Sequence, residues 1–87
     1  MAKVEIYSSM FCGFCHRAKQ LLKQRGIAFT EIDVGGDEKR RAEMIERAGG
    51  RRSVPQIFID DRHVGGCEEL YALDRQGGLA ALGGAAQ

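Results

Sequence analysis

Tryptophan is absent from the sequence, proline occurs only once, and there is no long run of apolar residues. Aromatic residues make up 7% of the chain, too few for a surface on which nucleic-acid bases stack. The charges almost balance, to a formal net charge of +1, so no basic field attracts nucleic acid or an anionic membrane. We therefore expect neither nucleic acid nor a membrane as a partner.

The first residues of the sequence also lack the features of an export signal. Charged and apolar residues alternate there, with no apolar run suited to a signal peptide or a membrane span. The expected location is the cytoplasm, where thiols are kept reduced. Apolar residues at 44% and charged residues at 29% are typical of a soluble globular protein, and residues 1–87 are expected to form one domain.

The three cysteines make a poor disulfide framework. Their number is odd, and a Cys12–Cys15 bond would close a loop too small to restrict the unfolded chain. Two cysteines this close together in a cytoplasmic protein indicate chemistry instead.

Apolar periodicity and chain breakers predict four strands and three to four helices. Strands are expected at residues 3–8, 28–34, 56–60 and 62–65, the last two joined by a tight turn at Asp60 and Asp61. Helices are expected from Gly13 to Arg25, from Asp37 to the glycines at 49 and 50, and from residue 67 through Leu73, with one more turn after Gly77 and a frayed end.

The order of these elements is β-α-β-α-β-β-α, typical of an α/β fold. The first two strands need a right-handed crossover and are therefore expected to be parallel. The final hairpin adds antiparallel strands, which gives a mixed four-stranded sheet with helices on both faces. The first helix has its apolar positions at Phe14, Ala18, Leu21 and Leu22, and the second at Met44, Ile45 and Ala48. Glu43 and Arg47 are spaced for an ion pair.

Cys12 follows a predicted strand and stands where the first helix begins. A free thiol has a pKa near 8.5, but thiols at helix N-termini in Cys-x-x-Cys motifs have values of roughly 3.5–7.5. The unpaired N–H groups and the positive end of the helix dipole stabilise a thiolate there. We therefore predict that Cys12 is the attacking thiolate and that Cys15, one turn along, is the resolving thiol.

Three other interpretations of the cysteine pair stay open. Both cysteines could be small buried apolar residues. A structural zinc site needs four ligands, which Cys67, His63 and His16 could complete in a zinc-stabilised adaptor. Residues 12–16 also spell the Cys-x-x-Cys-His motif of haem attachment, but that chemistry needs an export signal and a large apolar pocket, and the sequence shows neither. The redox interpretation explains the motif best.

Three motifs occur in order along the chain: Cys-Gly-Phe-Cys-His at 12–16, Ser-Val-Pro-Gln-Ile-Phe-Ile at 53–59 and Gly-Gly-Cys-Glu-Glu-Leu at 65–70. Together they make the chain resemble the glutaredoxins, and most of all their small bacterial dithiol class, over essentially its whole length. The resemblance implies a thioredoxin-like fold. It also implies glutathione-dependent reduction of disulfide-containing or glutathionylated proteins, which with glutathione are the expected partners.

The resemblance also implies a set of glutathione-binding residues. In the family the Val-Pro bond is cis, which would turn the backbone of Val54 outward beside Cys12 to pair with an extended substrate. The N–H groups of Cys67 and Glu68 would hold the γ-glutamyl carboxylate at a helix start, and Glu69 the ammonium group. The implied residues are Phe14, Arg52, Ser53, Val54, Pro55, Gly66, Cys67, Glu68 and Glu69. Cys67 is expected to pack as a small apolar side chain, with a redox role as the alternative.

The sequence departs from the dithiol pattern at two places. Gly13 and Phe14 replace the usual Pro and Tyr, and Cys-Gly-Phe opens the motif of the monothiol, iron–sulfur-carrying class. The alternative function is therefore a dimer that shares a [2Fe–2S] cluster, with Cys12 and glutathione as ligands; otherwise a monomer without metal is expected. Ser9 replaces the family's Lys for the glycyl carboxylate, and we expect Arg52, with Arg51 or Arg41, to take over.

Overall fold

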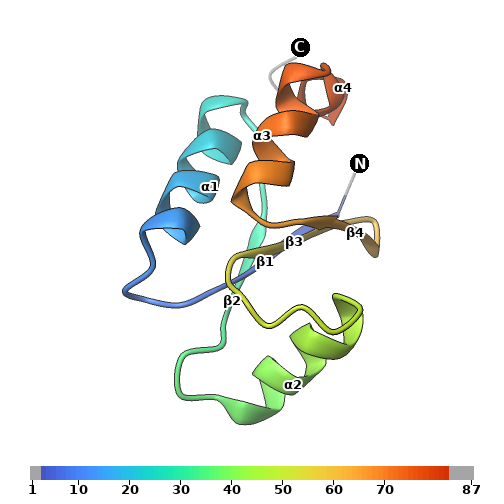
Figure 1. Cartoon of the computed structure of the whole chain (residues 1–87). Coiled ribbons are helices and arrows are strands. Elements are labelled where there is room, and N and C mark those ends of the chain that lie inside the picture. The colour runs from blue at the N-terminus through green and yellow to red at the C-terminus, as the bar shows by residue number, and fades with distance from the viewer. Residues whose placement is uncertain (1–2, 83–87) are drawn as a thin grey trace.

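Four strands form one sheet, and helices cover both of its faces (Figure 1). The structure is a computed structural model that describes residues 3–82. The elements in chain order are β1 (Val4–Ser8), α1 (Gly13–Gln24), β2 (Thr30–Asp33), α2 (Glu38–Arg47), β3 (Gln56–Ile59), β4 (Arg62–Gly65), α3 (Cys67–Arg75) and α4 (Gly78–Leu82). None of the helices within residues 3–82 is long and apolar enough to span a membrane.

The strands lie in the order β2-β1-β3-β4. β1 and β2 are parallel, whereas β3 runs antiparallel to both β1 and β4. This confirms the mixed four-stranded sheet expected from the sequence. Asp60 and Asp61 have φ values of 51° and 68°, as a tight two-residue hairpin turn requires. The extra helical turn is confirmed as α4, whereas the expected fraying concerns residues 83–87, which lie outside the described residues.

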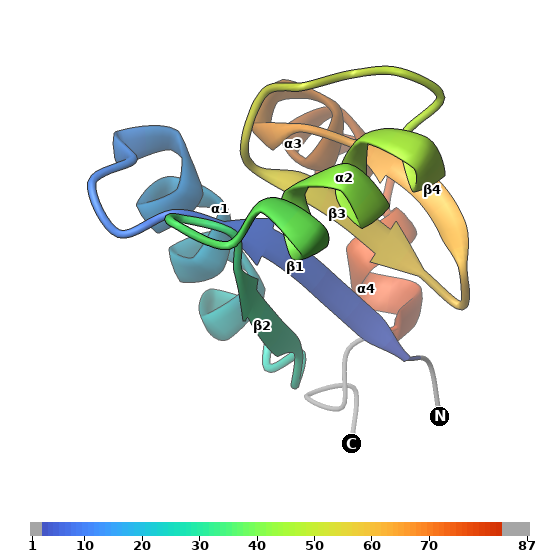
Figure 2. The ribbon, with the colours of Figure 1, turned by 90° about the horizontal axis from the view of Figure 1, so that it is seen from below.

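Each face of the sheet has its own apolar core. On one face α1, α3 and α4 cover the side chains of Val4, Ile6 and Ile57. On the other face α2 lies alone across the sheet (Figure 2) and covers Tyr7 and Phe58. The cysteine-bearing end of α1 therefore belongs to the first face, next to α3.

Tyr7 is fully buried, although in the sequence it alternates with the apolar Val4 and Ile6 and falls on the same side of the strand as Glu5. β1 is an inner strand of the sheet and is covered on both faces, so its two sets of side chains are both buried. The Tyr7 ring packs edge-on against Phe58 at 5.6 Å between centroids. Its hydroxyl donates a hydrogen bond to Glu43.

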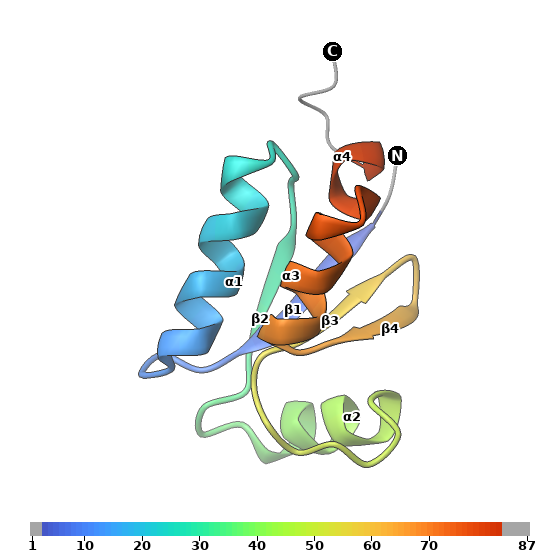
Figure 3. The same cartoon turned by 45° about the horizontal axis from the view of Figure 1, so that its top comes forward.

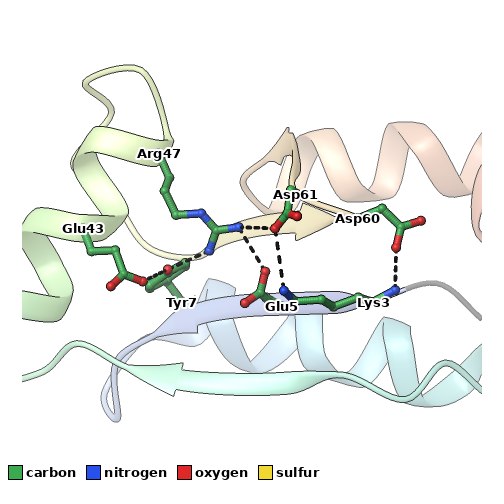
Figure 4. Close-up of polar contacts among 7 residues, drawn as sticks. All are labelled: Lys3, Glu5, Tyr7, Glu43, Arg47, Asp60 and Asp61. Carbon is green, nitrogen blue, oxygen red and sulfur yellow. Dashed lines mark hydrogen bonds and ion pairs between the residues drawn. The ribbon is translucent and has the colours of Figure 1, made fainter.

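The predicted ion pair between Glu43 and Arg47 is wrong. Both side chains instead contact the hydroxyl of Tyr7, because it lies directly beneath α2 (Figure 4). Arg47 forms its ion pairs with Glu5 at 3.0 Å and Asp61 at 3.3 Å. This network ties α2 to β1 and to the β3–β4 turn, on the face of the sheet opposite α1 (Figure 1).

Candidate active site

Cys12 is the N-cap residue of α1. Its backbone is extended, with φ −120° and ψ 111°, and its sulfur accepts a hydrogen bond from the backbone N–H of Cys15 at 3.1 Å. A cap of this kind satisfies one of the N–H groups that every helix start leaves unpaired. The sulfur of Cys12 therefore sits at the positive end of the helix dipole, where negative charge is favoured.

Cys12 and Cys15 lie in contrasting environments. Cys12 is half-buried, whereas Cys15 is fully buried, and neither forms a disulfide. Burial, together with the hydrogen bond to Cys12, raises the pKa of Cys15 to about 12. The pair thus consists of one sulfur that a substrate can reach and one thiol that holds its proton.

Val54 lies beside Cys12, as the resemblance implied. The Val54–Pro55 bond is cis, and the Val54 carbonyl oxygen is 3.7 Å from the sulfur of Cys12. Gln56, which is fully buried, donates a hydrogen bond from Nε2 to the carbonyl oxygen of Ser53 at 2.9 Å. Sequence reasoning assigned no role to Gln56, yet its side chain holds the loop that faces the cysteines.

The start of α3 forms the other side of the site. Gly66 is the N-cap of α3, and its backbone N–H donates to Oε1 of Glu69 at 2.6 Å. This hydrogen bond, more than the nearby Arg51, holds the pKa of Glu69 below its usual value. Gly65 has a φ of 125°, and a Cβ there would lie 2.8 Å from Glu69 Cγ, so the tight approach requires glycine.

Between these two segments lies a pocket of about 310 Å³. Its lining residues are Phe14, Arg51, Ser53, Val54, Pro55, Gly66, Cys67, Glu68 and Glu69. The fold therefore gathers all but one of the residues that the sequence suggested for glutathione into one open pocket beside Cys12.

Arg52 is the exception, because Arg51 lines the pocket in its place. The guanidinium of Arg51 turns toward Glu69 and lies 3.5 Å from its carboxylate. Arg52 contributes a backbone contact instead: its carbonyl oxygen accepts a hydrogen bond from the guanidinium of Arg41 at 3.4 Å. The cation at the rim of the pocket is therefore Arg51 rather than Arg52 or Arg41.

Phe14 and Cys67 also differ in their surroundings. Phe14, expected on the buried stripe of α1, is 58% exposed because it lies in the first turn of the helix, at the rim of the pocket. Cys67 is nearly buried and belongs to the core between the sheet and the helices. Burial raises the pKa of the Cys67 thiol, which fits a packing side chain rather than a reactive one.

The side chains of the zinc hypothesis are not gathered. Within residues 3–82, no group of three or more histidines, cysteines or acidic residues lies close enough to hold a metal ion. Nε2 of His16 contacts Gln20 at 3.2 Å, and Nε2 of His63 contacts Gln56 at 2.7 Å. The geometry of the described site favours thiol chemistry over a metal centre within one chain.

Comparisons with known proteins agree with this geometry. A family model described as Glutaredoxin matches residues 4–64. The chain is 55% identical over 82 residues to Glutaredoxin 3 of Escherichia coli K12, a match that covers 94% of this chain and 98% of that relative. The solution structure of glutaredoxin from Brucella melitensis is 47% identical with a TM-score of 0.82, covering 100% of this chain and 94% of that one.

A crystal structure of a buckwheat glutaredoxin–glutathione complex is 28% identical with a TM-score of 0.83, covering 93% of this chain and 76% of that chain. These matches confirm the thioredoxin-like fold implied by the three motifs. The chain therefore belongs to the glutaredoxin family of thiol–disulfide oxidoreductases.

Proposed function

We propose that this glutaredoxin uses glutathione to reduce protein–glutathione mixed disulfides and protein disulfides, with Cys12 as the attacking thiolate. The observation that carries the proposal is the position of the Cys12 sulfur, which caps α1 beside a pocket lined by Val54 and the start of α3. The N–H groups at the helix start favour the thiolate, which is the nucleophile in thiol–disulfide exchange.

The reduction of a glutathionylated protein proceeds in two exchanges. The Cys12 thiolate attacks the glutathione sulfur, a Cys12–glutathione disulfide forms, and the protein thiolate leaves and takes up a proton. A second glutathione thiolate then attacks the glutathione sulfur bound to Cys12. Oxidised glutathione forms, and the Cys12 thiolate is regenerated at the helix start, which makes Cys12 a good leaving group.

Cys15 supplies a second way to complete the reaction. Its sulfur attacks Cys12, a Cys12–Cys15 disulfide forms, and the bound partner leaves as a thiolate that takes up the proton released by Cys15. This step serves protein disulfides, since it frees a target that stays covalently attached to Cys12. Burial raises the pKa of Cys15 to about 12, so this thiol is protonated before it attacks and gives up its proton in the resolving step.

The pocket beside Cys12 suits the charged γ-glutamyl end of glutathione. The N–H groups of Cys67 and Glu68 in the first turn of α3 are suited to bind the γ-glutamyl carboxylate. Arg51, whose guanidinium lies 3.5 Å from Glu69 at the same end of the pocket, adds a cation for that carboxylate. The backbone of Val54 is the hydrogen-bonding partner for the cysteinyl part. The buckwheat relative, solved as a glutathione complex, supports glutathione as the ligand.

A glutathione-coupled assay with Cys12→Ser and Cys15→Ser tests the proposal. On a glutathionylated protein, Cys12→Ser should be inactive, and Cys15→Ser should remain active because glutathione alone completes that cycle. On a protein disulfide such as that of ribonucleotide reductase, both variants should fail. Deglutathionylation by Cys12→Ser at the wild-type rate would rule out the assignment.

A second candidate function is a [2Fe–2S] dimer with one Cys12 from each subunit and glutathione as the remaining ligand. Gly13 supports it, since it replaces the stiff proline ring of the usual dithiol motif next to the half-buried Cys12, at a helix start where a built Cβ meets no atom within 4 Å. Anaerobic incubation with iron, sulfide and glutathione, followed by absorbance and sedimentation measurements, tests this candidate. A coloured dimer supports it, and a colourless monomer rules it out.

We further propose that residues 1–87 act as one domain, monomeric without a cluster, in the cytoplasm. The requirement for a reduced Cys12 supports this location, because cytoplasmic thiols are kept reduced.

A further inference from the structure

Three large apolar side chains within residues 3–82 are strongly exposed: Met10 at 78%, Phe11 at 96% and Phe14 at 58%. All three lie within two residues of Cys12 in the sequence. A single exposed apolar residue is ordinary, but a group of them around a reactive atom marks a surface that binds something apolar.

The three residues fall on two sides of Cys12. Phe14 lines the pocket that reaches the start of α3, whereas Met10 and Phe11 are not among its lining residues. They lie on the loop that joins β1 to α1, and this loop extends away from α3 (Figures 1 and 3). Met10 and Phe11 therefore belong to an exposed loop that leads away from the pocket and directly precedes Cys12 in the chain.

The exchange reaction brings a target protein to this loop. Thiol–disulfide exchange joins the attacking, central and leaving sulfurs in sequence, so the target cysteine must come within about two S–S bond lengths, roughly 4 Å, of Cys12. When glutathione fills the pocket toward α3, that side of Cys12 is closed to the target chain, and the exposed β1–α1 loop next to Cys12 stays open to it. Residues that flank the target cysteine can then contact Met10 and Phe11.

We propose that Met10 and Phe11 form a docking surface, the Met10–Phe11 patch, for apolar side chains that flank the reactive cysteine of a protein target. This inference rests on the proposed function and names its preferred substrate class. Ser9, Met10 and Phe11 carry no charge, so the loop offers nothing to a charged flank. A phenylalanine ring supplies a large rigid contact, and a methionine adapts to targets of different shape.

Three glutathionylated substrates test this inference. Two are peptides that differ only in having leucines or serines on either side of the cysteine, and the third is free cysteine. The variants are Met10→Ser/Phe11→Ser and, as a control at the other end of α1, Lys23→Ser. We expect wild type and control to prefer the leucine peptide in kcat/KM by about tenfold. The double variant should lose that preference while keeping its activity on the free-cysteine substrate.

The outcomes distinguish failure of the proposed function from failure of the Met10–Phe11 patch. Wild-type protein that reduces none of the three substrates contradicts the proposed function itself. Three results overturn only the Met10–Phe11 patch. The wild type reduces both peptides at equal rates, or the double variant keeps the preference for the leucine peptide, or the double variant loses activity equally on all three substrates. Sedimentation of the protein without a cluster gives the last outcome. A concentration-dependent dimer that is lost in the double variant would overturn the proposal, because the patch would then bind a second copy of the chain.

Discussion

The backbone N–H of Cys15 donates a hydrogen bond to the sulfur of Cys12 over 3.1 Å, so the atom proposed as the nucleophile is also the cap of α1. The same contact serves stability and chemistry, because it satisfies a helix N–H and favours negative charge on the sulfur. These two roles are separable by substitution.

Cys12→Ser should leave the fold as stable as the wild type, whereas Cys12→Ala should lower the free energy of unfolding by about 1 kcal/mol. Serine is a preferred N-cap residue and alanine is a poor one. Urea denaturation of both variants checks this difference. If alanine proves as stable as serine, the sulfur does not cap the helix in solution.

The dithiol route should keep accelerating with pH in the alkaline range, where the monothiol route levels off because glutathione is an ordinary thiol with a pKa near 8.5. Burial raises the pKa of Cys15 to about 12, so at neutral pH only a small fraction is thiolate, and that fraction grows roughly tenfold per pH unit. The measurement is the rate at which the Cys12–glutathione disulfide converts to the Cys12–Cys15 disulfide, followed from mildly acid to alkaline pH. A rate independent of pH would show that Cys15 is not the protonated partner.

Lys19 should assist this resolving step. It lies one turn beyond Cys15 on α1, and its charge lowers the pKa of Cys15 against the effect of burial. Glu31 holds the ammonium group in place at 2.7 Å and accepts a second hydrogen bond from Ser8 at 2.6 Å. Lys19→Met should slow formation of the Cys12–Cys15 disulfide several-fold, and Lys23→Met, with the same loss of charge farther along α1, should not.

Arg51→Ala should raise the KM for glutathione by about tenfold, which is typical of a lost charge-assisted hydrogen bond. Arg52→Ala is the matched control, because Arg51 lines the pocket and Arg52 does not. Steady-state kinetics with varied glutathione distinguish the two. A larger rise in KM for Arg52→Ala than for Arg51→Ala would show that Arg52, as expected from the sequence, and not Arg51 binds glutathione.

Tyr7→Phe should lower the free energy of unfolding by about 1–3 kcal/mol, because a buried hydroxyl that binds both Glu43 and Arg47 is removed and its partners lose a contact. Activity should be unchanged, since this network lies under α2, on the face of the sheet opposite α1, the helix that carries the cysteines (Figure 1). Tyr71→Phe, at a half-buried position on α3, is the control and should stay close to wild type in thermal denaturation.

What the sequence predicted well depends on short-range chemistry. The cysteine pair at a helix start follows from the order of a strand, Cys12 and an amphipathic stretch, all within a few residues of one another. The position of Val54 beside Cys12 required the resemblance, since Cys12 and Val54 meet only in the folded sheet.

What the sequence missed depends on long-range packing. Tyr7 is buried because α2 covers β1, which no local alternation reveals. Arg51 and Arg52 are neighbours in the chain, and only the fold decides which of them reaches Glu69. Phe11 looks like a core residue by type, but it stands on the exposed loop before α1.

The most direct test of the central claim is alkylation of the reduced protein with a limiting amount of iodoacetamide at mildly acid pH, followed by mass spectrometry of the peptides. The account predicts that Cys12 is modified first and that Cys15 and Cys67 stay unmodified, because Cys12 is accessible and lies at the start of α1, whereas the other two cysteines are buried. Modification of Cys15 before Cys12, or no reaction at any of the three cysteines, would contradict it.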